Sequence, residues 1–186
     1  MNFLELAASR HSVRNYKPDP IPKESLDKIL EAGRVAPSAQ NRQPWRYIVL
    51  TEPEQIKALV KHTGLVGLSN FFIKSAPCVI VACADTKKNL RVNGQDYYLV
   101  DTAISFQQMI LCAWEMGIGS CWMAAFSEKI LAKYLALPKT WRIVAISAFG
   151  YPKDEKSMWG KVVSSFAGST KRQPIEEMVT YYDKGN

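Results

Sequence analysis

The chain has 186 residues, 47% of them hydrophobic, and a formal net charge of +7. This size and composition suit a single domain, residues 1–186, with an ample apolar core. The basic residues are scattered among acids, with no Lys/Arg block longer than two, which argues against a nucleic-acid-binding protein. No apolar run is long enough to span a membrane and no secretory leader opens the chain, so we expect a cytoplasmic protein without membrane contacts.

The four cysteines predict neither disulfides nor a metal site. Cys78, Cys83, Cys112 and Cys121 all lie within apolar runs and lack the paired spacing of zinc ligands. Reduced thiols in the core are therefore expected, with no bound metal. A redox role for Cys121 is the alternative.

The first half of the chain predicts helices and a strand in alternation. Asn2 with Glu5 forms a capping pattern for a short helix over residues 3–8. A proline at position 22 and one apolar face predict an amphipathic helix over 23–34. A strand over 47–50 and a helix over 53–62 follow.

The polar segment 37–45, PSAQNRQPW, lies between the second helix and the first strand. Its prolines and polar side chains leave little scope for regular structure. A rigid polar loop at the mouth of a strand is a natural ligand site.

The middle of the chain holds the most apolar segments. After a loop or broken helix over 64–74, the uninterrupted run 78–84 predicts a central strand, and 85–93 a charged loop. Apolar residues then cover nearly every side of a helix over 103–116, which predicts a helix buried all round. Glycines lead from it into a buried strand over 120–123.

The remaining elements are a helix over 127–135 and a strand over 143–149. Beyond these, residues 153–186 are polar with scattered hydrophobic side chains, which are too sparse for a core of their own. We interpret this segment as a C-terminal arm that packs on the body or on a partner subunit.

Five separated motifs occur together in this sequence, and they are Arg10-His11-Ser12-Val13-Arg14, the segment 37–45, Gly117-Ile118-Gly119-Ser120-Cys121-Trp122, Ala148-Phe149-Gly150-Tyr151-Pro152 and Lys171-Arg172-Gln173-Pro174. In this order they resemble the nitroreductase family of FMN-dependent oxidoreductases, over almost the whole chain. A single motif would carry little weight, but several in register are a strong signal.

The resemblance implies an α+β, three-layer fold with a mixed, mostly antiparallel sheet between helices. It also implies an intertwined homodimer with two FMN sites at the interface. The arm 153–186 would then cross onto the partner subunit. The alternation of helices and strands alone would instead suggest a doubly wound sheet.

The resemblance also assigns the cofactor-binding residues. Arg10, His11 and Ser12 would hold the phosphate and ribityl end of FMN, with Lys171 and Arg172 assisting, because guanidinium and ammonium groups suit a phosphate. The alternatives without a cofactor-binding role are that the arginines are solvated surface charges and that His11 is only a hydrogen-bonding turn residue.

The other end of the flavin would meet a second set of groups. Arg14 would reach the pyrimidine edge, where its charge stabilises the reduced flavin anion. The amides of Ala124 and Ala125 would face N5 and O4, and Asn70 would lie nearby. Pro37, Ser38 and Asn41 would come from the neighbouring subunit, completing the set implied by the family.

The implied function is hydride transfer from NADH or NADPH through FMN to a small electron-poor acceptor such as a nitroaromatic or quinone, and it requires no catalytic side chain. Alternatives are a flavin-binding sensor or storage protein without turnover, or the family's reductive dehalogenation or flavin-consuming oxygenation. The sequence departs from the family at His11, where arginine is common, and at Ala124-Ala125, where an acid and a glycine are known.

Overall fold

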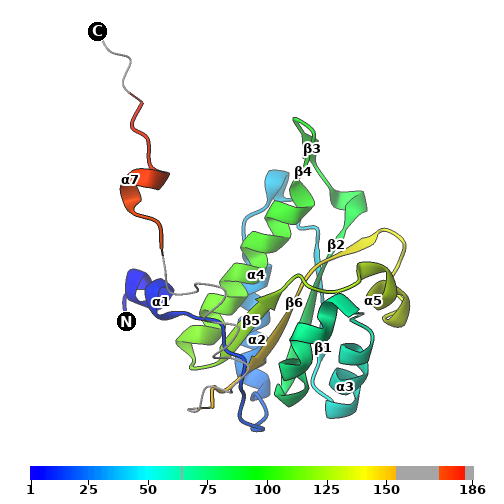
Figure 1. The fold of residues 1–186 in the computed structure, drawn as a ribbon. Helices are drawn as coiled ribbons and strands as arrows, with labels where there is room; N and C mark the ends of the chain where they lie inside the picture. Colours follow the sequence, from blue (N-terminus) through cyan, green and yellow to red (C-terminus); the bar gives the residue numbers. More distant parts are fainter. Residues whose placement is uncertain (64, 154–171, 183–186) are drawn as a thin grey trace.

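The computed structural model describes residues 1–63, 65–153 and 172–182. A four-stranded sheet in the order β1-β2-β6-β5 lies at its centre (Figure 1). Each neighbouring pair is antiparallel. The predicted α+β class with a mostly antiparallel sheet is thereby confirmed, and the doubly wound alternative is wrong. The strands are β1 (Trp45–Leu50), β2 (Cys78–Asp85), β5 (Gly119–Met123) and β6 (Trp141–Gly150).

One face of the sheet is covered by α3 (Pro53–Lys61) and α5 (Glu128–Tyr134). Val79 and Val81 of the central strand β2 point into this core. There they meet apolar residues from both helices, such as Leu59 and Leu131. Because successive strand residues face opposite sides, the alternating half of β2 is left for the other face.

The opposite face is covered by α2 (Lys23–Arg34) and α4 (Tyr97–Glu115). Ile80 of β2 packs there with Ile29 of α2 and with Phe106 and Met109 of α4. The uninterrupted apolar run of β2 is thus explained by burial on both faces. Two helical layers and one sheet make the three layers that the resemblance implied.

Local signals explain most helix boundaries. α1 (Phe3–Ser9) begins at a complete capping box, in which Asn2 and Glu5 each bond the other's backbone amide. Pro53 occupies the first turn of α3, where its missing N–H costs nothing. The predicted broken helix is a 3-10 helix, η2 (Leu65–Ser75), and the polar loop contains the short η1 (Ala39–Asn41).

The prediction that the central helix is buried on all sides is wrong for this chain. α4 begins earlier than expected, and one stripe of it faces outward: Leu99 is 47% exposed, Val100 46% and Ile104 39%. An apolar position in a helix predicts that its side chain is covered, but the sequence does not show whether the covering residues belong to the same chain or to another one. The exposed stripe leaves an apolar surface beside the buried face of α4.

The predicted charged loop over 85–93 holds more structure than expected. Its first part is η3 (Thr86–Lys88), and a two-stranded hairpin then follows, β3 (Arg91–Val92) and β4 (Gln95–Asp96). Asn93 and Gly94 form its turn with φ of 53° and 77°. An Asn-Gly pair is the preferred sequence for such a turn, because both positions need positive φ.

The C-terminal segment carries α7 (Ile175–Met178), which Figure 1 shows away from the sheet and its helices. Every residue from Arg172 to Tyr182 is exposed. The predicted arm residues 154–171 lie outside the described residues. Within the described part of the chain, no helix has the length and apolar character needed to cross a lipid bilayer.

Candidate functional site

The segment that follows α1 runs along the edge strand β5. Ser12 forms a parallel bridge with Ser120, and the Val13 amide donates to the Ser120 carbonyl at 2.9 Å. Further along, the Tyr16 hydroxyl donates to the Val13 carbonyl, and Lys17 N donates to the Tyr151 carbonyl. These bonds hold the predicted phosphate-binding residues in an extended conformation against the sheet.

Three of the predicted site residues alternate along this segment. In an extended chain, Arg10, Ser12 and Arg14 share one side, while Val13 between them is buried. All three influence the pKa of the same buried thiol, that of Cys121 in β5. Burial raises the pKa of Cys121, and Arg14, a hydrogen bond from Ser12 and Arg10 partly offset that rise. Two guanidinium groups and a hydroxyl therefore gather beside β5.

The same observation decides between the alternatives for Cys121. Its thiol is buried and its raised pKa keeps it protonated, whereas a reactive cysteine needs an exposed thiolate. We therefore interpret Cys121 as a packed strand residue. All four cysteines are free, and Cys78 and Cys83 are buried as well.

His11 lies at the end of α1 and is exposed. Its Nδ1 lies 3.1 Å from the Ser9 carbonyl, and its ring meets the edge of Trp114 with centroids 4.8 Å apart. Trp114 also donates from Nε1 to the Ser9 hydroxyl at 2.9 Å. These contacts anchor the Arg10–Arg14 segment to the C-terminal turn of α4.

A second group of predicted residues meets at the end of β5. The Asn70 side chain, buried in η2, donates from Nδ2 to the Ala125 carbonyl at 2.7 Å. Among the described residues, neither the Ala124 nor the Ala125 amide donates a hydrogen bond. The turn after β5 thus presents two backbone donors, and Asn70 holds it in place.

The loop 37–43 has an unusual backbone. Gln40, Asn41 and Gln43 have φ of 52°, 54° and 49°, in the left-handed region. Internal bonds support this shape: Gln43 N donates to Ser38 Oγ at 3.0 Å, and Gln43 Nε2 donates to Asn41 Oδ1 at 2.8 Å. Pro37 and Asn41 are exposed, which leaves the tip of the loop accessible.

The loop is tied to the other end of α4. The Ala39 amide donates to Asp101 Oδ1 at 2.9 Å. At about 1.5 Å of rise per residue, Asp101 lies about 20 Å along the helix from Trp114, where the Arg10–Arg14 segment is anchored. One chain therefore brings Arg10, Ser12, Arg14, Asn70, Ala124 and Ala125 to the surroundings of β5. It holds Pro37, Ser38 and Asn41 at the opposite end of α4 from the Arg10–Arg14 segment.

The two remaining predicted residues belong to the tail. Lys171 lies outside the described residues, and Arg172 is exposed. Sequence reasoning missed Asp101, whose only signal is an acid near the start of a mostly apolar helix. The described residues contain no cluster of three or more His, Cys, Asp or Glu side chains that could hold a metal ion.

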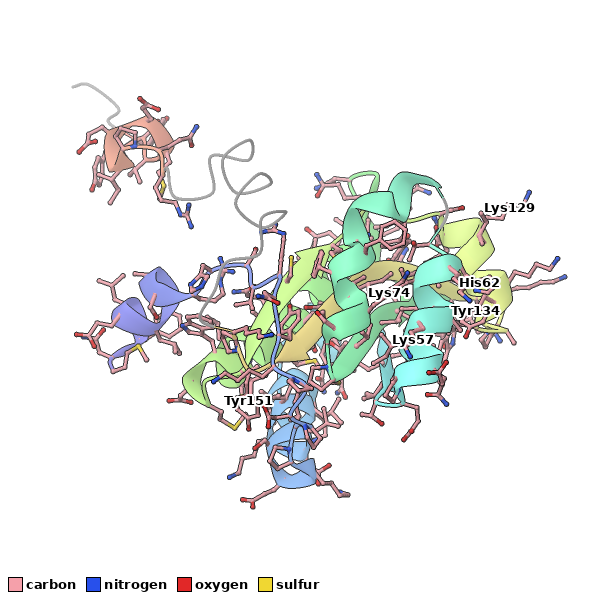
Figure 2. All side chains as sticks on the ribbon, turned by 60° about the horizontal axis from the view of Figure 1, so that its bottom comes forward. Lys57, His62, Lys74, Lys129, Tyr134 and Tyr151 are labelled. Atoms are coloured by element: carbon pink, nitrogen blue, oxygen red, sulfur yellow. The ribbon has the colours of Figure 1, made fainter. Side chains whose placement is uncertain are left out.

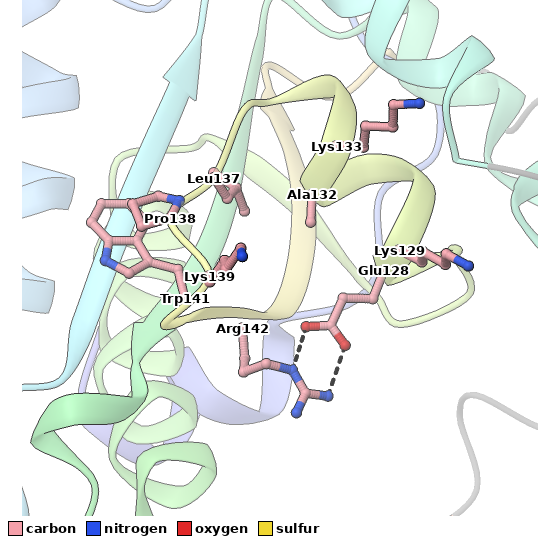
Figure 3. A pocket seen from close by; sticks show the side chains of 9 residues that line it. All are labelled: Glu128, Lys129, Ala132, Lys133, Leu137, Pro138, Lys139, Trp141 and Arg142. Atoms are coloured by element: carbon pink, nitrogen blue, oxygen red, sulfur yellow. Dashed lines mark hydrogen bonds and ion pairs between the residues drawn. The ribbon is translucent and has the colours of Figure 1, made fainter.

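A separate hollow of about 350 Å³ lies between α5 and the turn before β6 (Figure 3). Arg142 donates to both oxygens of Glu128, at 2.7 and 2.8 Å, and so joins α5 to β6. Of the predicted flavin-binding residues that the structure describes, none lines this hollow. Its lining residues are Glu128, Lys129, Ala132, Lys133, Leu137, Pro138, Lys139, Trp141 and Arg142.

The packing of α5 against α3 includes a ring stack. Figure 2 shows His62 beside Tyr134, and their ring centroids are 4.1 Å apart at an interplanar angle of 10°. His62 Nδ1 also lies 2.8 Å from the Ala58 carbonyl. His62 is thus a C-terminal cap residue of α3 that packs against α5.

The close contact between β5 and the arginine-bearing segment leads to a first prediction. A Cβ on Gly119 would lie 2.5 Å from Cγ2 of the buried Val13. We expect Gly119→Ala to lower the free energy of unfolding by about 1–3 kcal/mol through overpacking. Urea unfolding measures the loss. Gly94→Asn is the control, since a side chain there meets open space and the positive φ, which asparagine adopts more readily than most residues, should cost less than the overpacking at Gly119. Equal stability of Gly119→Ala and the wild type would contradict the packing.

Comparison with known proteins gives this geometry a context. The nitroreductase family model matches residues 7–65 and 63–151. A nitroreductase family protein from Clostridium difficile 630 has a similar structure, with a TM-score of 0.81, 33% identity, and coverage of 98% of this chain and 99% of that one. An FMN-dependent nitroreductase from Clostridium difficile R20291 gives a TM-score of 0.73 and 30% identity, covering 83% and 90%.

Curated relatives differ in their named activities. An NADH dehydrogenase from Thermus thermophilus is 31% identical over 180 residues, 80% of this chain and 86% of its own. An iodotyrosine deiodinase from Thermotoga neapolitana is 25% identical over 176 residues, 83% of this chain and 90% of its own. The matched motifs, the three-layer fold and these similarities together show that the chain belongs to the nitroreductase family.

Proposed function

We propose that this protein is an FMN-dependent NAD(P)H oxidoreductase that acts in the cytoplasm as a homodimer, with residues 1–186 as one domain. The observation that carries the proposal is the pair of donor groups at the two ends of β5. Arg10, Ser12 and Arg14 lie beside its start and the amides of Ala124 and Ala125 follow its end. At about 3.4 Å per residue, Ser120 and Ala124 are about 14 Å apart, a span that suits a phosphate, a ribityl chain and a fused ring.

The residues of this chain would bind and orient the cofactor. Guanidinium groups of Arg10 and Arg14 supply positive charge for a phosphate and for the pyrimidine edge of the flavin. Backbone donors at Ala124 and Ala125 suit the N5 and O4 edge, and Asn70 fixes their turn. Bound FMN would supply hydride transfer between NADH or NADPH and a small electron-poor acceptor, for which we propose nitroaromatics or quinones.

The loop 37–43 supports the dimer in this proposal. Its strained backbone and exposed tip mark it as a binding loop, yet α4 holds it about 20 Å from the Arg10–Arg14 segment of its own chain. We propose that Pro37, Ser38 and Asn41 contact the flavin of the partner subunit. The exposed stripe of α4 at Leu99, Val100 and Ile104 lies on the same helix and would be covered in such a pair.

The test of the function is a flavin titration followed by turnover. Purified protein should be yellow, or should gain flavin absorbance and quench FMN fluorescence on titration, and should oxidise NADH or NADPH with a quinone or nitroaromatic present. A colourless protein that leaves FMN fluorescence unchanged would refute the proposal. FMN binding without turnover with either nucleotide would instead favour a flavin storage or sensor protein.

A second candidate reaction has one specific support, the similarity to a protein named iodotyrosine deiodinase. Assays with a halogenated phenol beside the quinone would separate reductive dehalogenation from the proposed reaction. Consumption of the flavin itself under oxygen would indicate the oxygenase chemistry.

The phosphate end of the site gives a second prediction. We expect Arg10→Ala to weaken FMN binding by about 1–3 kcal/mol, the scale of a charge-assisted hydrogen bond left unmade. The apo-protein should keep its melting temperature, because Arg10 is a half-buried residue outside both hydrophobic cores. Lys17→Ala, which removes an equal charge from an exposed position on the same segment, is the control. If the apo-protein lost as much stability as the cofactor lost affinity, Arg10 would be a structural residue.

A further inference from the structure

Asp101 is a buried carboxylate with an incomplete set of partners. It is 3% exposed in the second turn of α4. Oδ1 accepts the Ala39 amide, whereas Oδ2 has no hydrogen-bond partner among the described residues. No lysine or arginine of the described chain forms an ion pair with it. A buried charge with one hydrogen bond lowers stability compared with a well-packed apolar side chain.

The contact that Asp101 does make is with the strained part of the loop 37–43. Ala39 begins η1 and precedes Gln40 and Asn41, both of which have positive φ. Conformations of this kind persist only where the surroundings hold them. After Gln40 and Asn41 in the sequence, Arg42 donates a hydrogen bond to the Asn89 carbonyl. Before them, the bond from Ala39 to Asp101 attaches the loop to α4.

We propose that Asp101 is a positioning residue that holds the loop 37–43 in the shape in which Ser38 and Asn41 reach the partner subunit's flavin. The inference rests on the proposed function. It assigns a purpose to a charged group inside an apolar helix, because a carboxylate accepts an amide hydrogen bond more strongly than a neutral group does. Asp101 acts through Ala39 and does not itself touch the flavin.

A positioning role and a purely structural role predict opposite results. A structural residue would lose stability and affinity together when replaced. For Asp101→Leu the apo-protein should be as stable as the wild type or more so, since replacing a buried unpaired charge by an apolar group removes its desolvation cost. Its FMN affinity should nevertheless fall about tenfold, as expected for one hydrogen bond between loop and body.

Two companion variants sharpen the comparison. Asp101→Asn keeps an oxygen for the Ala39 amide and should restore FMN affinity to within about threefold of the wild type. Thr102→Val is the matched control, because Thr102 is the next residue of α4, equally buried and also without a partner for its hydroxyl among the described residues. Its hydroxyl makes no hydrogen bond to the described loop, so FMN affinity should not change.

Amide hydrogen exchange of the apo-protein tests the loop without the flavin. The peptide covering 38–43 should exchange faster in Asp101→Leu than in the wild type, and at an unchanged rate in Thr102→Val. Unchanged exchange in Asp101→Leu would overturn the proposal. Faster exchange with unchanged FMN affinity would also overturn it, and would leave the proposed function intact.

Mixed dimers test the role across subunits. Co-expressed Arg10→Ala and Asp101→Leu chains form heterodimers in which one site receives Arg10 from the Asp101→Leu chain and an intact loop from the other. That site should bind FMN with wild-type affinity, at half the normal stoichiometry. If the loop served its own chain, both sites would carry a defect and no wild-type site would appear, which would overturn the cross-subunit role. Failure of the wild type itself to bind FMN would refute the proposed function, and the role of Asp101 with it.

Discussion

Phe106→Ala is expected to lower the free energy of unfolding by about 3–5 kcal/mol, the range for deleting a fully buried aromatic side chain. The ring lies between α4 and the sheet with no exposure. It stacks on Tyr47 of β1 and meets the rings of Trp122 and Phe149, from β5 and β6, with centroids 5.9, 5.0 and 6.2 Å away. Because these neighbours belong to three different strands, they cannot all close in on the space left behind.

Urea unfolding followed by tryptophan fluorescence measures this loss. Phe3→Ala makes the same chemical change at a side chain that is 72% exposed in α1, and should cost little. A loss below about 1.5 kcal/mol in Phe106→Ala would be typical of a tolerated swap and would contradict the packing.

Deletion of the residues after Ser169 is expected to abolish the dimer and to weaken FMN binding together. The tail carries Lys171 and Arg172, which the family resemblance places near the phosphate. It also carries exposed apolar residues, among them Ile175, Met178 and Tyr181, the last 90% exposed. Burying each such side chain against a partner contributes roughly 1.5–3 kcal/mol, so their loss removes much of what holds two subunits together.

Sedimentation at micromolar concentration, with absorbance read at both protein and flavin wavelengths, measures both effects. A shorter deletion that removes only residues 183–186 keeps Tyr182 and serves as control. An intertwined pair should bury more than about 2,000 Å² in total. A full-length protein that sediments as a monomer and still holds FMN would show that the site is built within one chain, and the roles of Ser38 and Asn41 across the interface would be withdrawn.

Local chemistry made much of the fold predictable. The capping box at Asn2 and Glu5 and the proline before α2 predicted where these helices begin. The continuous apolar run of β2 predicted its central place, because only a strand covered on both faces needs no polar side. The Asn93-Gly94 pair would have predicted the β3–β4 hairpin as well, but the surrounding charges favoured a loop.

The parts that depend on distant contacts were less predictable. The outward stripe at Leu99, Val100 and Ile104 has the same apolar character as the buried face of α4, so the sequence alone could not separate them. The motifs led to Arg10, Ser12 and Arg14, which the structure brings together. They gave no indication of Asp101, whose partner Ala39 lies 62 positions away and bonds through its backbone.

The length of α4 between Asp101 and Trp114 has a consequence for how the flavin is kept. If the loop at one end serves the partner and the arginines at the other end serve their own chain, no single subunit holds a whole cofactor site. The fraction of protein that retains FMN then depends on the protein concentration, because only the dimer has complete sites. Dilution below the dissociation constant of the pair would release flavin, and saturating flavin would in turn hold the pair together at concentrations where the apo-protein separates.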